Sequence, residues 1–276
     1  MTYLPLAPPG ATPLRVLTIA GSDSGGGAGM QADIRTCTLL GVHTLCAVTA
    51  VTVQNSLGVK DFHCVPSEVV AAQIAAVCDD IGLQAAKTGM LASAEIIGAV
   101  AQSWREHGAG VALVVDPVCA SMHGDALLDE DALNSFRAEL FPLATLVTPN
   151  LHEVRLLVDI DVVDSSSQAD AARALHALGP KWAMVKGGHM PGSASSTDLL
   201  FDGNEFHEYE SPRVNTGHDH GAGDTLAAAV ACALANGYPL IDAVSFAKGW
   251  VTECLRTSYP LGHGHGPVSP LFRLHS

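Results

Sequence analysis

Short apolar segments alternate with helical stretches along most of the chain, and this alternation limits the possible folds more than any other feature. Each apolar segment ends at or next to a glycine, a proline or a polar residue, which is typical of a buried strand. Such segments lie at 15–21, 45–53, 84–90, 111–118, 145–150 and 182–188, and helical stretches at 29–41, 67–80, 93–107, 129–140, 151–158 and 168–178. This βαβ spacing predicts an α/β fold with a mostly parallel sheet covered by helices on both faces.

The last third of the chain departs from this alternation. Two runs within 198–210 flank Asp202-Gly203, which predicts a β-hairpin. Two further helices are expected at 225–237 and 240–257. No linker or internal repeat separates these parts, so we expect one domain over residues 14–276, preceded by a loose tail over residues 1–13.

Charge and composition exclude several classes of protein. The chain has 276 residues, 48% of them hydrophobic, and a formal net charge of −14, whereas a nucleic-acid-binding protein normally shows a basic patch. No apolar run reaches the ~18 residues that span a bilayer, and the N-terminus lacks the basic region of a signal peptide. The seven cysteines include no Cys-x-x-Cys pair and are typical of reduced thiols. We therefore expect a cytoplasmic protein that binds neither nucleic acid nor membrane.

Polar residues follow the predicted strands where the carboxyl ends of the strands should meet. In open parallel sheets, ligands bind at this edge. The residues concerned are Asp23, Gln54, Asn55, Asp116, Asn150, Glu153 and Lys186. Their convergence predicts a binding site. Because only 14 lysines and arginines are present, a polyphosphate ligand would depend mainly on backbone amides and a metal ion for its neutralisation.

The segment 215–225, NTGHDHGAGDT, leads into a helix of small residues. The amides of Gly221, Ala222, Gly223 and Asp224 would lie at the N-terminus of that helix, which is a natural anion site. Asp224 itself has two interpretations. It caps the helix, which would stabilise it by ~1 kcal/mol, or it accepts a proton from a substrate hydroxyl beside a bound phosphate. One residue can fill both roles.

Longer strings give the sequence a resemblance to a known family. In order along the chain they are LTIAGSDSGGGAGMQADIRT, AVTAVTVQNSLGV, KTGM, DPV, TPNLHEV, VKGGH, HGAGDT and LGHGHGPV. Together they resemble the hydroxymethylpyrimidine/phosphomethylpyrimidine kinases of thiamine biosynthesis, in the ribokinase-like superfamily. The resemblance implies a three-layer α/β/α domain, in agreement with the alternation of strands and helices.

The resemblance implies that Asp33, Gln54 and Met90 contact the pyrimidine, and that the glycine run around Gly27 closes over the substrate. Asp33 and Gln54 can exchange hydrogen bonds with a ring nitrogen and an exocyclic amine, and Met90 can pack on a flat ring. From the residues alone, core packing is the favoured role of Met90, and an exposed helix position suits Asp33 equally well.

The resemblance also implies ATP and Mg²⁺. Asp116 and Glu153 are the candidate magnesium ligands, since Mg²⁺ prefers one or two carboxylates together with water and phosphate oxygens. The simpler alternatives are a strand-end residue for Asp116 and a first-turn carboxylate favoured by the helix dipole for Glu153. Lys186, with Asn150 and Thr225, is expected to contact the nucleotide.

One residue departs from the family pattern. Hydroxymethylpyrimidine kinases usually carry Cys at the position of Asp224, and the Asp form belongs to the wider ribokinase-like group, including many pyridoxal kinases. We expect an ATP-dependent kinase that phosphorylates a small heteroaromatic alcohol, 4-amino-5-hydroxymethyl-2-methylpyrimidine, and its monophosphate. The resemblance also implies a homodimer. A pyridoxal kinase is the alternative enzyme. A non-catalytic pyrimidine or nucleotide sensor is the alternative of another class, although a sensor would not need Asp224 as a base.

The histidine pairs His218/His220 and His263/His265 have a spacing that suits metal ligands. No third ligand is defined by the sequence, so we favour the glycine-loop interpretation of 215–225 over a zinc site.

Overall fold

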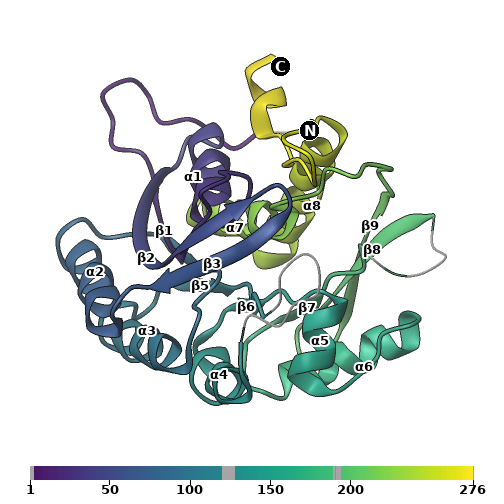
Figure 1. Cartoon of the computed structure of the whole chain (residues 1–276), viewed down its shortest axis with the longest axis horizontal. Helices are drawn as coiled ribbons and strands as arrows, with labels where there is room; N and C mark the ends of the chain where they lie inside the picture. The colour runs from purple at the N-terminus through teal and green to yellow at the C-terminus, as the bar shows by residue number, and fades with distance from the viewer. Residues whose placement is uncertain (1–2, 120–127, 189, 191–193, 276) are drawn as a thin grey trace.

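The computed structural model describes residues 3–119, 128–188, 190 and 194–275. Within these residues, nine strands form one sheet in the order β3-β2-β1-β4-β5-β6-β7-β8-β9 (Figure 1). The strands are β1 (Arg15–Ser22), β2 (His43–Asn55), β3 (Gly58–Cys64), β4 (Ala85–Thr88), β5 (Ala112–Val115), β6 (Leu146–Val147), β7 (Ala183–Val185), β8 (Ser195–Phe201) and β9 (Phe206–Pro212). Neighbouring strands are parallel along the stretch β2-β1-β4-β5-β6-β7. The pairs β2-β3, β7-β8 and β8-β9 are antiparallel. The predicted α/β fold with a mostly parallel sheet is confirmed.

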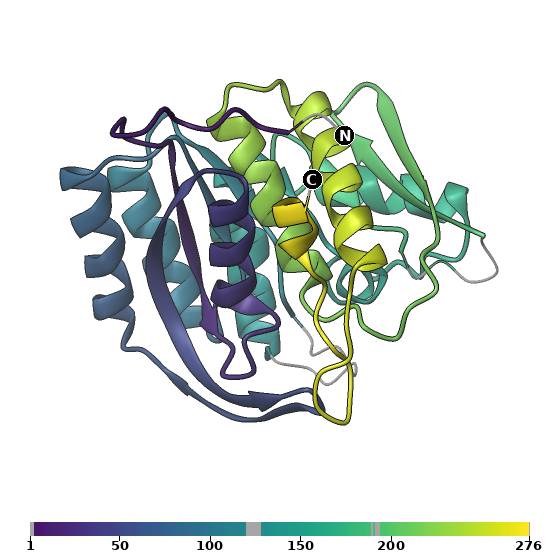
Figure 2. The ribbon, with the colours of Figure 1, turned by 90° about the horizontal axis from the view of Figure 1, so that it is seen from above.

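Helices cover both faces of this sheet (Figures 1 and 2). One layer contains α2 (Ser67–Asp80), α3 (Ala94–His107), α4 (Glu130–Ser135), α5 (Leu151–Val158) and α6 (Ser165–His176); the other contains α1 (Gly29–Leu39), α7 (Ala222–Ala235) and α8 (Leu240–Arg256). Alternate strand residues enter opposite cores: Leu17 packs in the first, whereas Val16 packs in the second. Because the central strands are buried on both faces, they appear in the sequence as continuous apolar runs.

Three elements differ from the sequence prediction. The strand β3 was not predicted, because it is an edge strand with no buried residue, and its residues, such as Lys60 and Asp61, form no apolar run. The helix expected at 129–140 divides into α4 and a π-helical turn, Phe136–Leu140. The helix expected at 168–178 begins at Ser165, where the Asp164 side chain caps it by accepting a hydrogen bond from the Ser167 amide at 2.8 Å.

The N-terminal segment 3–13 has no regular secondary structure, but it is tied to the domain. Leu4 is 3% exposed and belongs to the core under α7 and α8. The Arg273 guanidinium lies 3.9 Å from the centre of the Tyr3 ring. The expectation of a loose tail therefore needs correction at these two residues.

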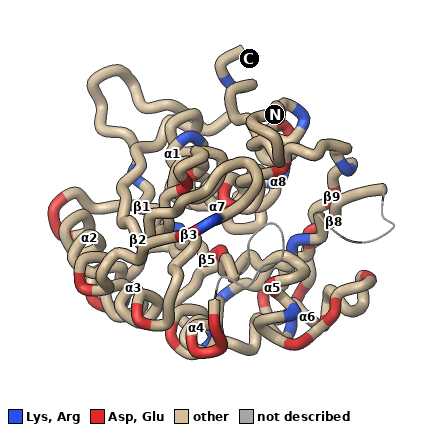
Figure 3. The backbone as a smooth tube through the Cα atoms, viewed as in Figure 1, with Lys and Arg blue, Asp and Glu red and all other residues tan. Residues whose placement is uncertain are grey.

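The acidic surplus is spread over the outer surface, with Asp and Glu along α2, α3 and α4 (Figure 3). Among the described residues, no helix has both the length and the apolarity required to cross a bilayer.

Candidate active site

The glycine loop ends at the start of α7. Gly221, with φ +79°, precedes the helix, and a Cβ atom there would lie 2.2 Å from the carbonyl oxygen of Gly27. The Ala222 amide donates to the Asp219 carbonyl at 3.0 Å. Within the described chain, the amides of Gly223 and Asp224 have no acceptor, so these two are the free donors of the predicted anion site.

Asp224 is the third residue of α7, and it does not cap the helix. Its carboxylate accepts hydrogen bonds from the Lys87 ammonium at 2.9 Å and from the Gly29 amide at 3.1 Å, both outside its own helix. Burial alone would raise the pKa of Asp224, but the charge and hydrogen bond of Lys87 outweigh it and lower the pKa. The capping interpretation is therefore wrong, and the side chain is a charged carboxylate that remains 14% exposed.

Asp33 lies beneath this carboxylate. It is fully buried, and it accepts a hydrogen bond from the Thr18 hydroxyl and two from Lys87, each at 3.1 Å. Burial raises the pKa of Asp33 to about 7, against the opposing charge of Lys87. Both carboxyl oxygens thus have internal partners, whereas the direct pyrimidine contact expected for Asp33 needs an accessible oxygen.

Lys186 and Asp116 meet beside the same helix start. The Lys186 ammonium lies 2.8 Å from Asp116 Oδ1, which also accepts a hydrogen bond from the Thr148 hydroxyl at 3.0 Å. A Cβ atom at Gly223 would lie 3.2 Å from Lys186 Nζ and 3.4 Å from Asp116 Oδ2. The missing side chain of Gly223 therefore leaves the free amides, the ammonium and a carboxylate facing one small space.

Asn150 and Glu153 form a capping box at the start of α5. The Asn150 side chain accepts from the Glu153 amide at 2.9 Å, and the Glu153 carboxylate accepts from the Asn150 amide at 2.7 Å. Burial raises the pKa of Glu153 to about 8; Lys186 opposes the shift and Asp116 adds to it. The first-turn alternative for Glu153 is thus present in the structure, and Asn150 has a structural role whether or not it contacts a nucleotide.

The charges of this centre suit a divalent cation. Four carboxyl groups lie near two ammonium groups among the residues described, and with all four ionised there is an excess of two negative charges: Asp33, Asp116, Glu153 and Asp224 against Lys87 and Lys186. Asp116 and Glu153 are on the side of Lys186, and carboxylate oxygens are the ligands that Mg²⁺ prefers. These two residues fit a magnesium ion bound together with phosphate oxygens.

A second group of polar residues joins the two glycine loops. Asp23 accepts hydrogen bonds from the amides of Gly25, Gly27 and Ala28 at 2.7–2.9 Å, and its carboxylate lies 3.1 Å from His220 Nε2. Burial would raise the pKa of Asp23, but these hydrogen bonds lower it overall.

His220 lies between two residues that the sequence predicts on the substrate side. Its Nε2 lies 3.4 Å from Gln54 Nε2, and a Cβ atom at Gly27 would meet its ring at 2.4 Å. Gln54 and Gly27, both expected on the substrate side, are therefore neighbours across this imidazole. His218 instead accepts a hydrogen bond from the Gly266 amide. In the described chain, no three His, Cys, Asp or Glu side chains gather closely enough to hold an ion.

Met90 is 9% exposed but packs in neither of the two hydrophobic cores. Its sulfur would lie 3.4 Å from a Cβ atom at Gly21, at the end of β1. Its place at the strand ends, outside both cores, supports the ring-packing role over core packing. Thr225 is buried within α7, one residue after Asp224. His189 of the VKGGH string lies outside the described residues.

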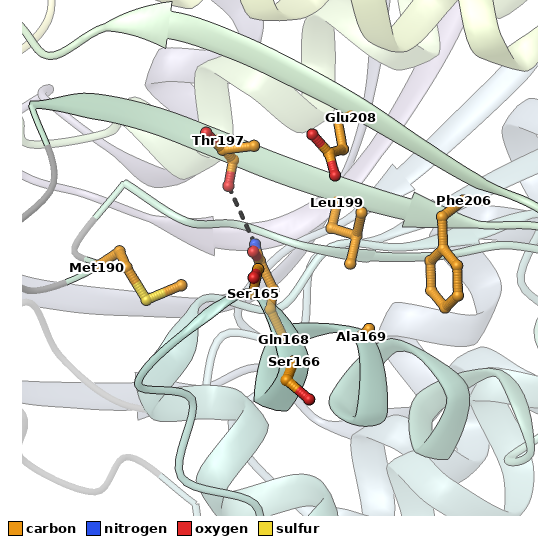
Figure 4. Close-up of a pocket in the computed structure, with 9 residues that line it drawn as sticks. All are labelled: Ser165, Ser166, Gln168, Ala169, Met190, Thr197, Leu199, Phe206 and Glu208. Carbon is orange, nitrogen blue, oxygen red and sulfur yellow. Dashed lines mark hydrogen bonds between the residues drawn. The ribbon is translucent and has the colours of Figure 1, made fainter.

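A cavity of about 500 Å³ lies elsewhere, between α6, β8 and β9 (Figure 4). Gln168 and Thr197 face each other in it, and Met190, Leu199 and Phe206 supply apolar walls. Its lining contains neither a lysine nor one of the clustered aspartates, so this cavity is separate from the charged centre.

Comparison of the chain with known proteins shows its family. The model of the phosphomethylpyrimidine kinase family matches residues 23–269. The chain belongs to the phosphomethylpyrimidine kinase family. A relative from Mycobacterium leprae named hydroxymethylpyrimidine/phosphomethylpyrimidine kinase is 68% identical over 277 residues, which cover 99% of each chain.

Solved structures of kinases share the ribokinase-like fold of this family. A Bacillus subtilis pyridoxal kinase in complex with ADP has a TM-score of 0.87 at 32% identity, covering 95% of this chain and 100% of that one. A phosphomethylpyrimidine kinase from Clostridium difficile has a TM-score of 0.77 at 35% identity, covering 87% of this chain and 98% of that one. The predicted family and three-layer fold are confirmed.

Two residues of the charged centre and its surroundings, Lys87 and His220, were not predicted in these places from the sequence. Lys87 stands in the apolar run 84–90, where a buried ammonium requires an acidic partner, and that requirement was the available signal. His220 was considered only as a metal ligand. Its contact with Asp23 spans 197 residues of sequence, and no local pattern indicates it.

Proposed function

We propose that the protein transfers the γ-phosphoryl group of ATP to the hydroxymethyl oxygen of 4-amino-5-hydroxymethyl-2-methylpyrimidine, and then phosphorylates the monophosphate, in thiamine biosynthesis. One observation carries the proposal: the free amides of α7 lie beside the Lys186 ammonium at Gly223, and the Asp224 carboxylate of the next residue is close enough to help raise the pKa of Lys186. Donors for a phosphoryl group and an acceptor for a hydroxyl proton are the two requirements of an alcohol kinase. Family membership and the name of the M. leprae relative agree with this activity.

The chemistry follows from positioning and charge. The amides of Gly223 and Asp224, with Lys186, stabilise the charge that spreads over the oxygens of the transferred group. The Asp224 carboxylate accepts the hydroxyl proton while the new O–P bond forms and ADP departs with the bridging oxygen. Bringing the hydroxyl and the phosphate together in this space supplies much of the acceleration.

On the acceptor side, Gln54 and Met90 are the residues that we assign to the pyrimidine. Gln54 is half-buried and offers an amide to the ring, and Met90 lies at the strand ends outside both cores. The Gly27 loop, which packs its backbone against Gly221, closes this side of the site. We assign Asp33 to the support of Lys87 in place of a direct ring contact.

Mg²⁺ belongs to the same proposal. Asp116 and Glu153 would hold it, and the ion would neutralise phosphate charge that this chain, with few basic residues, leaves uncompensated. Asn150 and Thr225 would be placed near the nucleotide by their helix starts. We also place the reaction in the cytoplasm, which the seven free cysteines support, and expect a homodimer, which size-exclusion chromatography with light scattering tests.

A pyridoxal kinase activity is the second candidate. The aspartate at 224 and the structural similarity to the Bacillus subtilis pyridoxal kinase both favour it. The deciding experiment measures ADP release and product mass with the pyrimidine alcohol, its monophosphate, pyridoxal, pyridoxine and ribose. Turnover confined to pyridoxal and pyridoxine would replace the pyrimidine proposal, and ATP turnover with none of the acceptors would favour a sensor.

A further inference from the structure

Lys87 places an ammonium group in the middle of the sheet. Its strand, β4, lies between β1 and β5, and its side chain is fully buried. Removing a charged amine from water costs several kcal/mol unless well-placed opposite charges replace the hydration. A lysine in this position therefore indicates a role that an apolar residue of similar size would not fulfil.

The partners of Lys87 come from two different helices that pack against each other. Asp33 belongs to α1, and both of its oxygens lie 3.1 Å from Lys87 Nζ. Asp224 belongs to α7, and its Oδ1 lies 2.9 Å from the same nitrogen. One ammonium group thus bridges the helix next to the substrate loop and the helix that presents the free amides.

The remaining contacts fix the orientation of the Asp224 carboxylate. Its Oδ2 accepts the Gly29 amide at 3.1 Å, so each oxygen has one donor. Gly89 leaves room for the ammonium, because a Cβ atom at Gly89 would lie 2.9 Å from Lys87 Nζ. The carboxylate of Asp224 is therefore held in one orientation, with only its outer side open.

The pKa values of Asp33, Asp224 and Lys87 shift in different directions. Burial raises the pKa of Asp33 to about 7, whereas the pKa of Asp224, despite its burial, is lowered by Lys87. The pKa of Lys87 itself is raised: burial opposes this, but the charges of Asp224 and Asp33 prevail. Other charged or titratable groups around the three are Asp116, Glu153, Lys186, His220, Cys46 and Cys232.

We propose that Lys87 is a positioning residue for phosphoryl transfer, which holds the Asp224 carboxylate oriented and charged and turns to Asp33 when Asp224 takes up the substrate proton. This inference rests on the proposed function. Before transfer, with Asp33 ionised, two carboxylates and one ammonium carry a net charge of −1. After transfer, the hydroxyl proton is on Asp224, Lys87 keeps its protons and remains paired with Asp33, and the net charge is zero. The proton then leaves through the exposed side of Asp224.

The test is the pH dependence of kcat for the acceptor alcohol in Lys87→Met, an unbranched apolar replacement of similar size. Without the ammonium, two buried carboxylates face each other, and protonation of Asp224 becomes easier. We expect kcat at pH 7 to fall by about 30-fold or more. We also expect the acidic limb of the profile to move up by at least ~1 pH unit, so that part of the activity returns at high pH.

Asp33→Asn provides a second variant of nearly unchanged size. It removes the carboxylate that competes for Lys87, so that Asp224 becomes the only charged partner of the ammonium among these three groups. The acidic limb should therefore move to lower pH, opposite to the shift in Lys87→Met. A folded Lys87→Met protein with the limb at its wild-type position overturns the proposal. If that variant does not fold, Asp33→Asn decides: an unmoved limb, or one moved upward, overturns the proposal.

Lys248→Met is the matched control. Lys248 forms a second buried pair, 2.8 Å from Asp198, between α8 and β8. Its loss should lower the melting temperature but leave the shape of the pH profile unchanged. A purely structural role of Lys87 would give that same result.

A readout without turnover separates this inference from the proposed function. The ¹³C carboxyl resonance of Asp224, assigned with Asp224→Asn, should titrate at higher pH in Lys87→Met than in the wild type. If no acceptor is phosphorylated, the proposed function fails while this titration still shifts. If acceptors are phosphorylated but neither the resonance nor the limb moves, only the role of Lys87 fails.

Discussion

Replacing Asp224 with Asn separates its chemistry from its structural contacts. The carboxylate has two donors as partners, the Lys87 ammonium at 2.9 Å and the Gly29 amide at 3.1 Å. An asparagine offers one oxygen and one NH₂ group in place of two oxygens. It therefore keeps one of these hydrogen bonds, and its NH₂ group faces the second donor, with which it cannot bond. Lys87 remains paired with Asp33, and no charge is left alone in the interior.

These contacts set two different magnitudes. The lost hydrogen bond should lower the free energy of unfolding by about 1–3 kcal/mol, a melting-temperature shift of about 2–10 °C in a chain of this size. Loss of the proton acceptor should lower kcat on the free alcohol at least ~100-fold, or about 2.7 kcal/mol in the barrier. ATP binding should change little, because the free amides and Lys186 remain.

Asp198→Asn is a control with the same bonding pattern. Asp198 accepts the Gly187 amide at 2.9 Å and the Lys248 ammonium at 2.8 Å. It should lose at least as much stability, because Lys248 keeps only the Ser196 hydroxyl as a side-chain partner among the described residues, with kcat within a few-fold of the wild type. The assay combines thermal unfolding, ATP titration and ADP release with the pyrimidine alcohol. If Asp224→Asn keeps its activity within a few-fold, or if both variants lose activity equally, Asp224 is not the base.

Three further substitutions test other parts of the site. Glu153→Gln can keep the capping box, so it should raise the Mg²⁺ concentration needed for half-maximal rate several-fold with little change in the acceptor KM; an unchanged Mg²⁺ dependence would remove Glu153 from the metal site. Asp224→Cys should shift the ratio of kcat/KM toward the monophosphate; an equal loss with both acceptors would contradict the charge argument. Gly27→Ala puts a Cβ atom 2.4 Å from the His220 ring, so the acceptor KM should rise by about tenfold or more, whereas Gly217→Ala, in open space, should be neutral; equal KM values for the two would show that the loop contact is not needed.

The elements that local patterns specify were predictable from the sequence. β1 and β5 appear as apolar runs because both of their faces are buried, and α5 begins where Asn150 and Glu153 have capping-box spacing. β3 was not predictable in this way, since an exposed edge strand needs no apolar run.

The site residues at the strand ends were predictable from the sequence, whereas the buried Lys87 and its pairing were not. Lys186 and Asp116 follow predicted strands, so their convergence could be expected from the fold. Lys87 is 54 residues from Asp33 and 137 from Asp224. Nothing local joins the three, and only the cost of burying a lone ammonium in the apolar run indicates that partners must exist.

In the proposed reaction, Lys87 and Lys186 divide the charge of the centre between two tasks. We propose that Lys186, beside the free amides, faces the phosphoryl group, whereas Lys87 is paired with Asp224, the carboxylate to which we assign the proton. In the first transfer, the alcohol supplies a proton that cancels the excess charge around Lys87. In the second, the acceptor is a phosphate whose second pKa is ~6, so it arrives mostly as a dianion and brings no proton that must be removed. Asp224 then stays charged beside an approaching anion, and Lys87, already shared with Asp33, compensates it only in part. We therefore expect the aspartate at this position to favour the alcohol over the monophosphate, however the pyrimidine ring is recognised.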